Sequence, residues 1–191
     1  MPGKALIVLA HPAERSLSRL FAQTAHEALS SAGHETILLD LYAEKFDPVL
    51  SSAERAAYYA SPPETAAIAD KASLLAEAEV LVLVFPTWWF GMPAILKGWI
   101  DRVFAPGVAF DHAIDFGPIK PKLTKLKKVV VITTLGSPAW IDWLVMRRPR
   151  PPHPEYRSLR PLRSTGKVRD VVALRSGKSE LEKHRKFQSA N

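Results

Sequence analysis

The residues best suited to chemistry lie in three short segments, each directly after an apolar run: residues 11–18, 87–90 and 133–136. The chain contains no cysteine, which excludes thiol catalysis, disulfides and thiolate metal sites. No Ser-His-Asp order, carboxylate pair or histidine cluster at metal-ligand spacing is present, so no metal site is expected. Asp111 and His112 are interpreted as polar surface residues. Any reaction here must therefore proceed without a side-chain nucleophile.

The first segment combines hydroxyl groups with the predicted start of a helix. Ser16 is a favourable N-cap residue, and apolar residues at helical spacing follow it. A helix N-terminus offers free N–H groups and the positive end of the helix dipole, which suit a phosphate. Ser16 and Ser18 add hydroxyl donors, and His11 or Arg15 adds positive charge. No GxGxxG sequence follows the preceding strand, so an ordinary capped helix with His11 in a turn stays an alternative.

The second segment follows a continuous apolar run at residues 80–85, which is typical of a strand covered on both faces. Pro86 ends this strand, because proline cannot donate to a sheet ladder. The aromatic residues Trp88, Trp89 and Phe90 come next, before a helix that begins at Pro93 or Ala94. Ligands of open α/β sheets bind beyond the carboxyl ends of the strands. The alternative is that the aromatics cap the core or fill a subunit contact.

The elements that must position these segments alternate along the chain. Strands are predicted at residues 4–10, 35–41, 80–85 and 128–134, and helices from Ser16 to near Gly33, at 53–59, at 65–78 and from Pro93 onward. On the first helix Leu17, Leu20 and Phe21 are expected on the apolar face, and on the last one Arg102 lies off the apolar stripe. This order predicts an α/β fold with a doubly wound parallel sheet. A short fifth strand is predicted at 171–174.

Charge divides the chain into two parts. Residues 147–191 hold 13 basic and 4 acidic residues, a balance of +9, whereas the 191-residue chain as a whole has a net charge of +7. We therefore predict a folded domain at 1–148 and a basic, proline-rich segment at 149–191 that is a degenerate last strand and helix. No apolar run reaches the roughly 20 residues that span a bilayer, and no signal-peptide layout is present, which favours the cytoplasm.

The sequence of residues 85–110, FPTWWFGMPAILKGWIDRVFAPGVAF, resembles the flavin-binding segment of the NAD(P)H:quinone oxidoreductase (DT-diaphorase-like) family, which has a flavodoxin-like fold. The resemblance implies that the aromatic loop lines the flavin ring and the substrate pocket, through Pro86, Thr87, Trp88, Trp89 and Phe90. It also implies that the first segment is the flavin phosphate site. The matching positions there are His11, Ser16, Leu17 (through its backbone N–H) and Ser18.

The third segment, Thr133, Thr134, Leu135 and Gly136, matches a loop that reads close to TTGG in that family and donates N–H groups to the flavin ring. Leu135 replaces the first glycine of that pattern. The tyrosine and histidine that follow the loop in the family have no counterparts here, where Ile141 and Trp143 stand nearby. Taken alone, the segment reads equally as a strand–helix turn.

The resemblance implies an enzyme, an NAD(P)H dehydrogenase of the quinone type, with NAD(P)H as co-substrate and FAD, or alternatively FMN, as cofactor. It would pass a hydride through the flavin to a quinone-like small molecule, and work as a homodimer. A regulatory flavin- or nucleotide-binding subunit of a membrane transport system is the alternative. Nucleic acid is not an expected partner, since the basic tail has charge but no aromatic interleaving.

Overall fold

The structure is a computed structural model that describes residues 2–58, 68–89, 91–111, 119–135 and 171–173. Gly136, Phe90 and the predicted turn after residue 136 lie outside the described residues. The elements are β1 (Lys4–Leu9), α1 (Leu17–Ser31), β2 (Glu35–Asp40), α2 (Ser52–Ala57), α3 (Ala69–Glu77), β3 (Val80–Pro86), α4 (Ala94–Val103), β4 (Phe110–Asp111), β5 (Lys120–Pro121), β6 (Lys128–Thr134) and β7 (Val171–Ala173).

Five strands form one parallel sheet in the order β2-β1-β3-β6-β7, with β3 in the centre. The predicted doubly wound parallel sheet is therefore confirmed, as is the predicted fifth strand. Because β1 lies next to both β2 and β3, the chain winds in one direction from β1 to β2 and in the other from β3 to β7. The crevice between β1 and β3, where the winding reverses, is the usual ligand position in such sheets.

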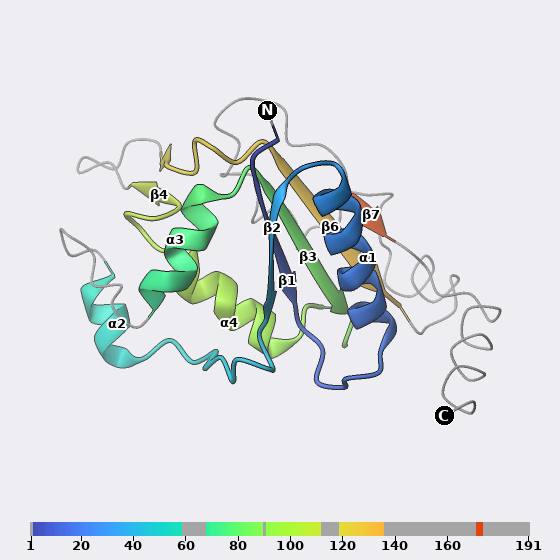
Figure 1. The fold of residues 1–191 in the computed structure, drawn as a ribbon. Helices are drawn as coiled ribbons and strands as arrows, with labels where there is room; N and C mark the ends of the chain where they lie inside the picture. The colour runs from blue at the N-terminus through green and yellow to red at the C-terminus, as the bar shows by residue number, and fades with distance from the viewer. Residues whose placement is uncertain (1, 59–67, 90, 112–118, 136–170, 174–191) are drawn as a thin grey trace, which may run out of the picture.

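Helices cover both faces of this sheet, which explains why the central strands are apolar throughout (Figure 1). On one face α1 packs Phe21, Ala22 and Ala25 against alternate residues of β1 and β3. On the other face α3 and α4 contribute the second cluster, in which Trp99 is fully buried. All seven residues of β3 are buried. The first two site segments therefore extend from the buried central strands of the sheet.

Helix α1 begins and ends as predicted. Ser16 caps its N-terminus, and Gly33 follows its last turn with φ +89°, a conformation that glycine adopts without strain. The predicted apolar face was wrong at Leu20, which is 54% exposed. Ser18 is buried instead. The sheet-facing stripe runs through Ser18 and Ala22, so a polar residue occupies a core position in the first turn.

Helix α4 begins at Ala94 with Pro93 as its N-cap, within the predicted range. The expectation that Arg102 lies off the buried stripe was wrong. Arg102 is buried, and its Nε and Nη2 donate to Oε1 of Glu54 at 2.9 and 2.5 Å. Its Nη1 donates to the carbonyl of Asp47 at 2.5 Å. A charged residue can take this place because all three contacts are hydrogen bonds, which offset its desolvation.

Arg102 joins α4 to residues 47–54, which come before the helix in the sequence. Glu54 lies in the first turn of α2, where it forms a capping box with Ser51. Burial opposes ionisation of Glu54, but the hydrogen bonds from Ser51 and Arg102 outweigh it and lower the pKa of the carboxyl below its ordinary value. Next to this contact, Pro48 packs directly on Gly98, where a side chain would overlap the proline backbone.

Two short elements differ from the prediction. No strand was predicted within residues 104–122, but β4 and β5 pair antiparallel there. A strand of two residues is too short to show an alternation of apolar and polar residues, which explains why this pairing was not predicted. Helix α3 begins at Ala69, and the first residues of its predicted range, 65–67, lie outside the described part of the chain. In the described residues no helix is long and apolar enough to cross a membrane.

Candidate functional site

The first two predicted segments meet at the crevice between β1 and β3. The N–H of Ala10 donates to the carbonyl of Val84 at 2.9 Å, so the pairing of β1 with β3 continues one residue past the end of β1. Directly beyond it, the rings of His11 and Trp88 approach to 6.3 Å between centroids, tilted by 56°. Residues 77 positions apart in the sequence are thus neighbours at the reversal point of the sheet, as the prediction required.

The first turn of α1 has hydrogen-bond donors that have no partner within the helix. Ser16 Oγ accepts the N–H of Arg19 at 3.2 Å, and the Ser16 carbonyl accepts from Leu20 at 3.1 Å. The N–H groups of Leu17 and Ser18 are at the first two helical positions, which have no partner inside a helix. Ser18 Oγ is buried, and no described residue accepts its proton. A buried hydroxyl without an acceptor is costly, which points to a ligand as its missing partner.

His11 has a different role from a positive charge. Its Nδ1 accepts the N–H of Ala13 at 3.0 Å, so that nitrogen carries no proton and the ring proton is on Nε2. The imidazole in this arrangement is neutral and is fixed by its own loop. In this arrangement the ring of His11 lies beside that of Trp88, and the N-terminus of α1 is a source of positive potential near them.

The aromatic loop is held in a tight turn. Trp88 and Gly91 exchange two backbone hydrogen bonds, of 3.1 and 2.9 Å, which close the turn around Trp89. Trp89 has φ +49°, an unusual value for a bulky residue, and its side chain is 98% exposed. Trp88 is 41% exposed. Trp89 therefore does not cap the core, whereas Trp88 is partly buried, and the alternative of a subunit contact stays a prediction.

The third segment lies beside the second, as predicted. Thr87 Oγ1 and Thr133 Oγ1 are 2.8 Å apart, and the Thr87 N–H donates to the carbonyl of Thr134 at 2.8 Å. These two bonds extend the β3–β6 pairing by one residue past Pro86. Leu135 is not among the residues with positive φ, so its backbone does not require the glycine found in the resembling family.

One pair next to this site was missed by the sequence analysis. Arg19 Nη2 donates to Asp40 Oδ2 at 2.5 Å, joining the first turn of α1 to the end of β2. Asp40 Oδ1 accepts the N–H groups of Tyr42 and Ala43 at 3.1 and 3.2 Å. The signal that the sequence offered for Asp40 was an acidic residue at the end of a predicted strand, followed by a turn. This signal does not indicate that the partner of Asp40 lies 21 residues earlier in the chain.

The described residues contain no cluster of histidine and acidic side chains suited to a metal ion. Asp111 pairs with Lys122 at 3.4 Å, with both side chains more than 40% exposed, which fits its interpretation as a surface residue. His112 lies outside the described part of the chain.

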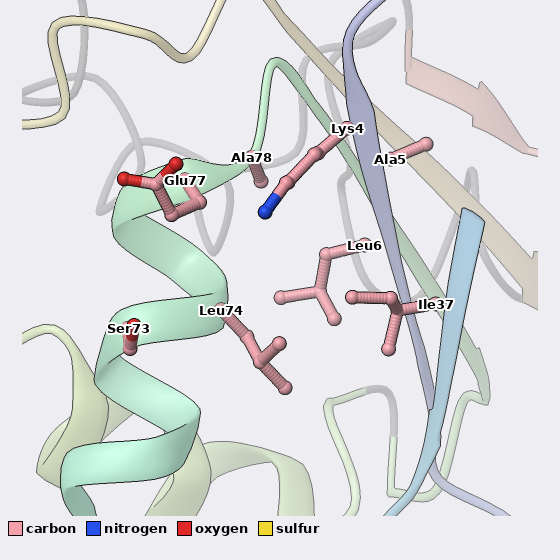
Figure 2. A pocket seen from close by; sticks show the side chains of 8 residues that line it. All are labelled: Lys4, Ala5, Leu6, Ile37, Ser73, Leu74, Glu77 and Ala78. Atoms are coloured by element: carbon pink, nitrogen blue, oxygen red, sulfur yellow. The ribbon is translucent and has the colours of Figure 1, made fainter. Parts of the chain in front are cut away.

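A separate hollow of about 70 Å³ lies at the opposite end of the sheet, between α3 and the first two strands (Figure 2). Lys4 extends over it from the start of β1 toward Glu77 of α3, and Leu6, Ile37 and Leu74 form its apolar part. Because parallel strands have all their amino ends on one side, this hollow is remote from the crevice at the carboxyl ends. It takes no part in the candidate site.

The fold and this crevice match a known class of protein. Residues 3–145 match the flavodoxin-like fold family, and the chain belongs to that family. The structure also superposes on that of Smu.1420 from Streptococcus mutans UA159 with a TM-score of 0.73 and 29% sequence identity, covering 98% of this chain and 97% of the other.

Among sequence relatives, the chain is 40% identical over 152 residues to NAD(P)H dehydrogenase (quinone) 1 of Cavia porcellus, covering 70% of this chain and 54% of the relative. It is 37% identical over 136 residues to an uncharacterized NAD(P)H oxidoreductase of Haemophilus influenzae, covering 69% and 64%. The chain thus spans about half to two thirds of the length of these relatives. The resemblance to quinone oxidoreductases found in the sequence is confirmed.

Proposed function

We propose that this protein is a flavin-dependent oxidoreductase that passes a hydride from NAD(P)H, through bound flavin, to a quinone or a similar two-electron acceptor. The observation that carries the proposal is the meeting of the α1 terminus and the aromatic loop at the β1–β3 crevice, marked by the contact of His11 with Trp88. The similarity to an NAD(P)H dehydrogenase of the quinone type supports the choice of reaction.

The residues present fit a flavin phosphate. A phosphate is an acceptor of several hydrogen bonds, and the first turn of α1 offers the N–H groups of Leu17 and Ser18 together with the buried, unpartnered hydroxyl of Ser18. Ser16 Oγ already accepts from Arg19, but its own hydroxyl proton is available to donate. The dipole of the 15-residue helix adds positive potential at the same point.

The same crevice fits a flat ring system. We assign Trp88, Trp89 and Phe90 to the wall of this site, and the exposed faces of Trp88 and Trp89 support the assignment because they are available for stacking. The paired threonines Thr87 and Thr133 fix the spacing between this wall and the third segment, since their hydroxyls bond each other. We assign the backbone of Thr134, Leu135 and Gly136 to the edge of the ring, as the resemblance implies.

A bound flavin would supply the hydride-transfer chemistry, and the protein's own residues bind, orient and exclude water. The helix terminus would hold the phosphate end, and the aromatic wall and the third segment would hold the ring end. Trp88 and Trp89 would exclude water from the ring face. Reduction of a quinone takes up one proton besides the hydride, and this proton can come from solvent, since it is assigned to no described side chain.

Four finer statements belong to the proposal. FAD is favoured as cofactor, with FMN as the alternative, and residues 1–148 form the flavin-binding domain. The protein acts as a homodimer, because exposed tryptophans beside a binding crevice are suited to a subunit contact. Its location is the cytoplasm. Neither the described residues nor the comparisons offer an observation that favours the regulatory-subunit alternative.

The proposal is tested by the visible spectrum of the purified protein and the mass of the cofactor released from it, followed by NAD(P)H oxidation with a quinone. We expect flavin absorbance and quinone-dependent turnover. A protein that neither retains nor rebinds any flavin would overturn the proposal.

A further inference from the structure

We propose that Arg19 and Asp40 form a positioning pair that sets the first turn of α1 for recognition of a phosphate group. The inference rests on the proposed flavin-binding function and adds two residues to it that neither the sequence analysis nor the resemblance assigned. Neither residue is taken to touch the ligand. Their effect is exerted through the N–H groups and hydroxyl of the turn between them.

Arg19 is fixed at both its main chain and its side chain. Its backbone N–H donates to Ser16 Oγ at 3.2 Å, and its Nη2 donates to Asp40 Oδ2 at 2.5 Å. Leu17 and Ser18, which carry the available donors, are the two residues between these anchors. Holding Ser16 and Arg19 in place therefore also fixes the direction of the N–H groups between them.

Asp40 is itself a rigid support. It is the last residue of β2, and the next residue, Leu41, continues the sheet by donating its N–H to the carbonyl of Leu9 at 3.0 Å. Asp40 Oδ1 accepts two further N–H groups, from Tyr42 and Ala43. With both carboxylate oxygens occupied by donors of the protein, Asp40 anchors Arg19 and is not left to bind a ligand hydroxyl.

The pair is sheltered enough to hold its geometry. The side chains of Arg19 and Asp40 are 26% and 11% exposed, less than those of the amino-end pairs such as Lys4 with Glu35, at 43% and 65%. Charge-assisted hydrogen bonds gain strength when they are shielded from water. Because the two charges cancel, the pair adds little net potential, and its contribution is the preorganisation of donors before the ligand arrives.

The test compares flavins with and without a phosphate. Apo-protein is titrated with riboflavin, FMN and FAD, following the quenching of flavin fluorescence, for the wild type and for Arg19→Met, which keeps the aliphatic stem and removes the guanidinium. We expect the dissociation constant of the tighter phosphorylated flavin to rise about five- to tenfold, the size of a lost helix-terminal interaction. Riboflavin affinity should be unchanged. Arg19→Lys, which can still reach Asp40, should recover part of the difference.

Arg102→Met is the matched control, because it breaks another sheltered arginine–carboxylate contact in α4, away from the phosphate segment. It should lower the melting temperature at least as much as Arg19→Met and leave the ratio of the riboflavin and phosphorylated-flavin dissociation constants unchanged. A purely structural role of Arg19 would weaken riboflavin and phosphorylated flavins alike, or neither, and either result overturns the inference.

A double variant, Arg19→Met with Asp40→Asn, adds a second criterion. If the two residues act as a pair, the double variant loses no more phosphate discrimination than Arg19→Met alone. Additive losses would show independent roles and contradict the inference. Wild-type protein that binds none of the three flavins would instead refute the proposed function, so the two failures are distinguishable.

Discussion

At the amino ends of the strands, Lys127 donates to Glu79 at 2.8 Å and Lys125 to Glu77 at 2.7 Å, whereas at the carboxyl ends the hydroxyl of Ser18 is buried without a partner among the described residues. At the amino end Gly33 has a positive φ, which a glycine adopts without strain, while the carboxyl end holds Trp89 at φ +49° with nearly all of its side chain in solvent. Both ends belong to one sheet and share the same buried strands.

This difference indicates that the amino end contributes to stability, whereas the carboxyl end has features that a binding site requires. Paired surface charges each contribute little and require no ligand. An orphan hydroxyl, unused helix N–H groups and a strained, exposed tryptophan all cost free energy in the ligand-free protein, and such costs concentrate at binding sites. The comparison therefore predicts that substitutions at the two ends will separate stability from flavin affinity.

The largest effect is expected from a residue that belongs to neither end. In Gly98→Ala the new methyl group would overlap the carbonyl oxygen and Cβ of Pro48, so α4 or the loop at Pro48 must shift. We expect the free energy of unfolding to fall by about 1–3 kcal/mol, as for other overpacked cores. Urea denaturation measures it. Unchanged stability would show that the contact at Pro48 is loose, and the variant also serves as a reference for destabilisation unrelated to phosphate.

At the carboxyl end, Ser16→Ala with Ser18→Ala should raise the dissociation constant of the phosphorylated flavin by at least about tenfold, because two hydroxyl donors to a charged group are lost. Isothermal titration of the apo-protein measures it. The single variants should separate the two properties. Ser16→Ala removes the helix cap and lowers stability by about 1 kcal/mol. Ser18→Ala removes an unpartnered hydroxyl and should leave stability unchanged or raise it.

If both single variants lower stability equally, Ser18 has a partner in the protein, and the comparison between the two ends fails at this position.

In the aromatic loop, Trp89→Gly should leave the free energy of unfolding unchanged or raise it by up to about 1 kcal/mol, since glycine adopts positive φ without strain. Little burial is lost, because the side chain is 98% exposed. Flavin affinity should fall, as the ring loses a stacking surface. Trp88→Gly, at a half-buried position with ordinary φ, is the control and should be destabilising. A loss of stability in Trp89→Gly would contradict the assignment of strain to this turn.

The smallest effect is expected at the amino end, from Glu79→Gln. The hydrogen bond from Lys127 is the main reason that the pKa of Glu79 lies below its ordinary value of 4.5. A lowered pKa in the folded state means that the carboxylate stabilises the protein above about pH 4.5, and that this contribution is lost as the pH falls through the folded value. The melting temperatures of wild type and variant should therefore differ slightly at pH 7, and converge in acid and in high salt.

Flavin affinity should be the same in Glu79→Gln and wild type. A loss of affinity would show that the two ends of the sheet are coupled.

Much of this protein could be predicted from the sequence because its strongest signals are local. The apolar run at 80–85 predicted a central strand, Ser16 predicted the start of α1, and Pro93 marked the start of α4. The three candidate segments follow from the ends of these elements, the resemblance implied that the segments of His11 and Trp88 serve one ligand, and the structure brings these two rings together.

Tertiary structure alone decided which polar residues would be buried and with what partners. Arg102 is a charged residue at a helix position that periodicity places off the apolar stripe, yet it is buried, as is Ser18, while Leu20 is exposed. The partners of Arg102 and Arg19 are 48 and 21 residues away in the sequence. Helical period and strand alternation describe the face of one element, whereas a buried ion pair depends on how two elements pack. The sequence thus located the candidate site, whereas the packing of α1 against β2 decided the pairing of Arg19 with Asp40 beside it.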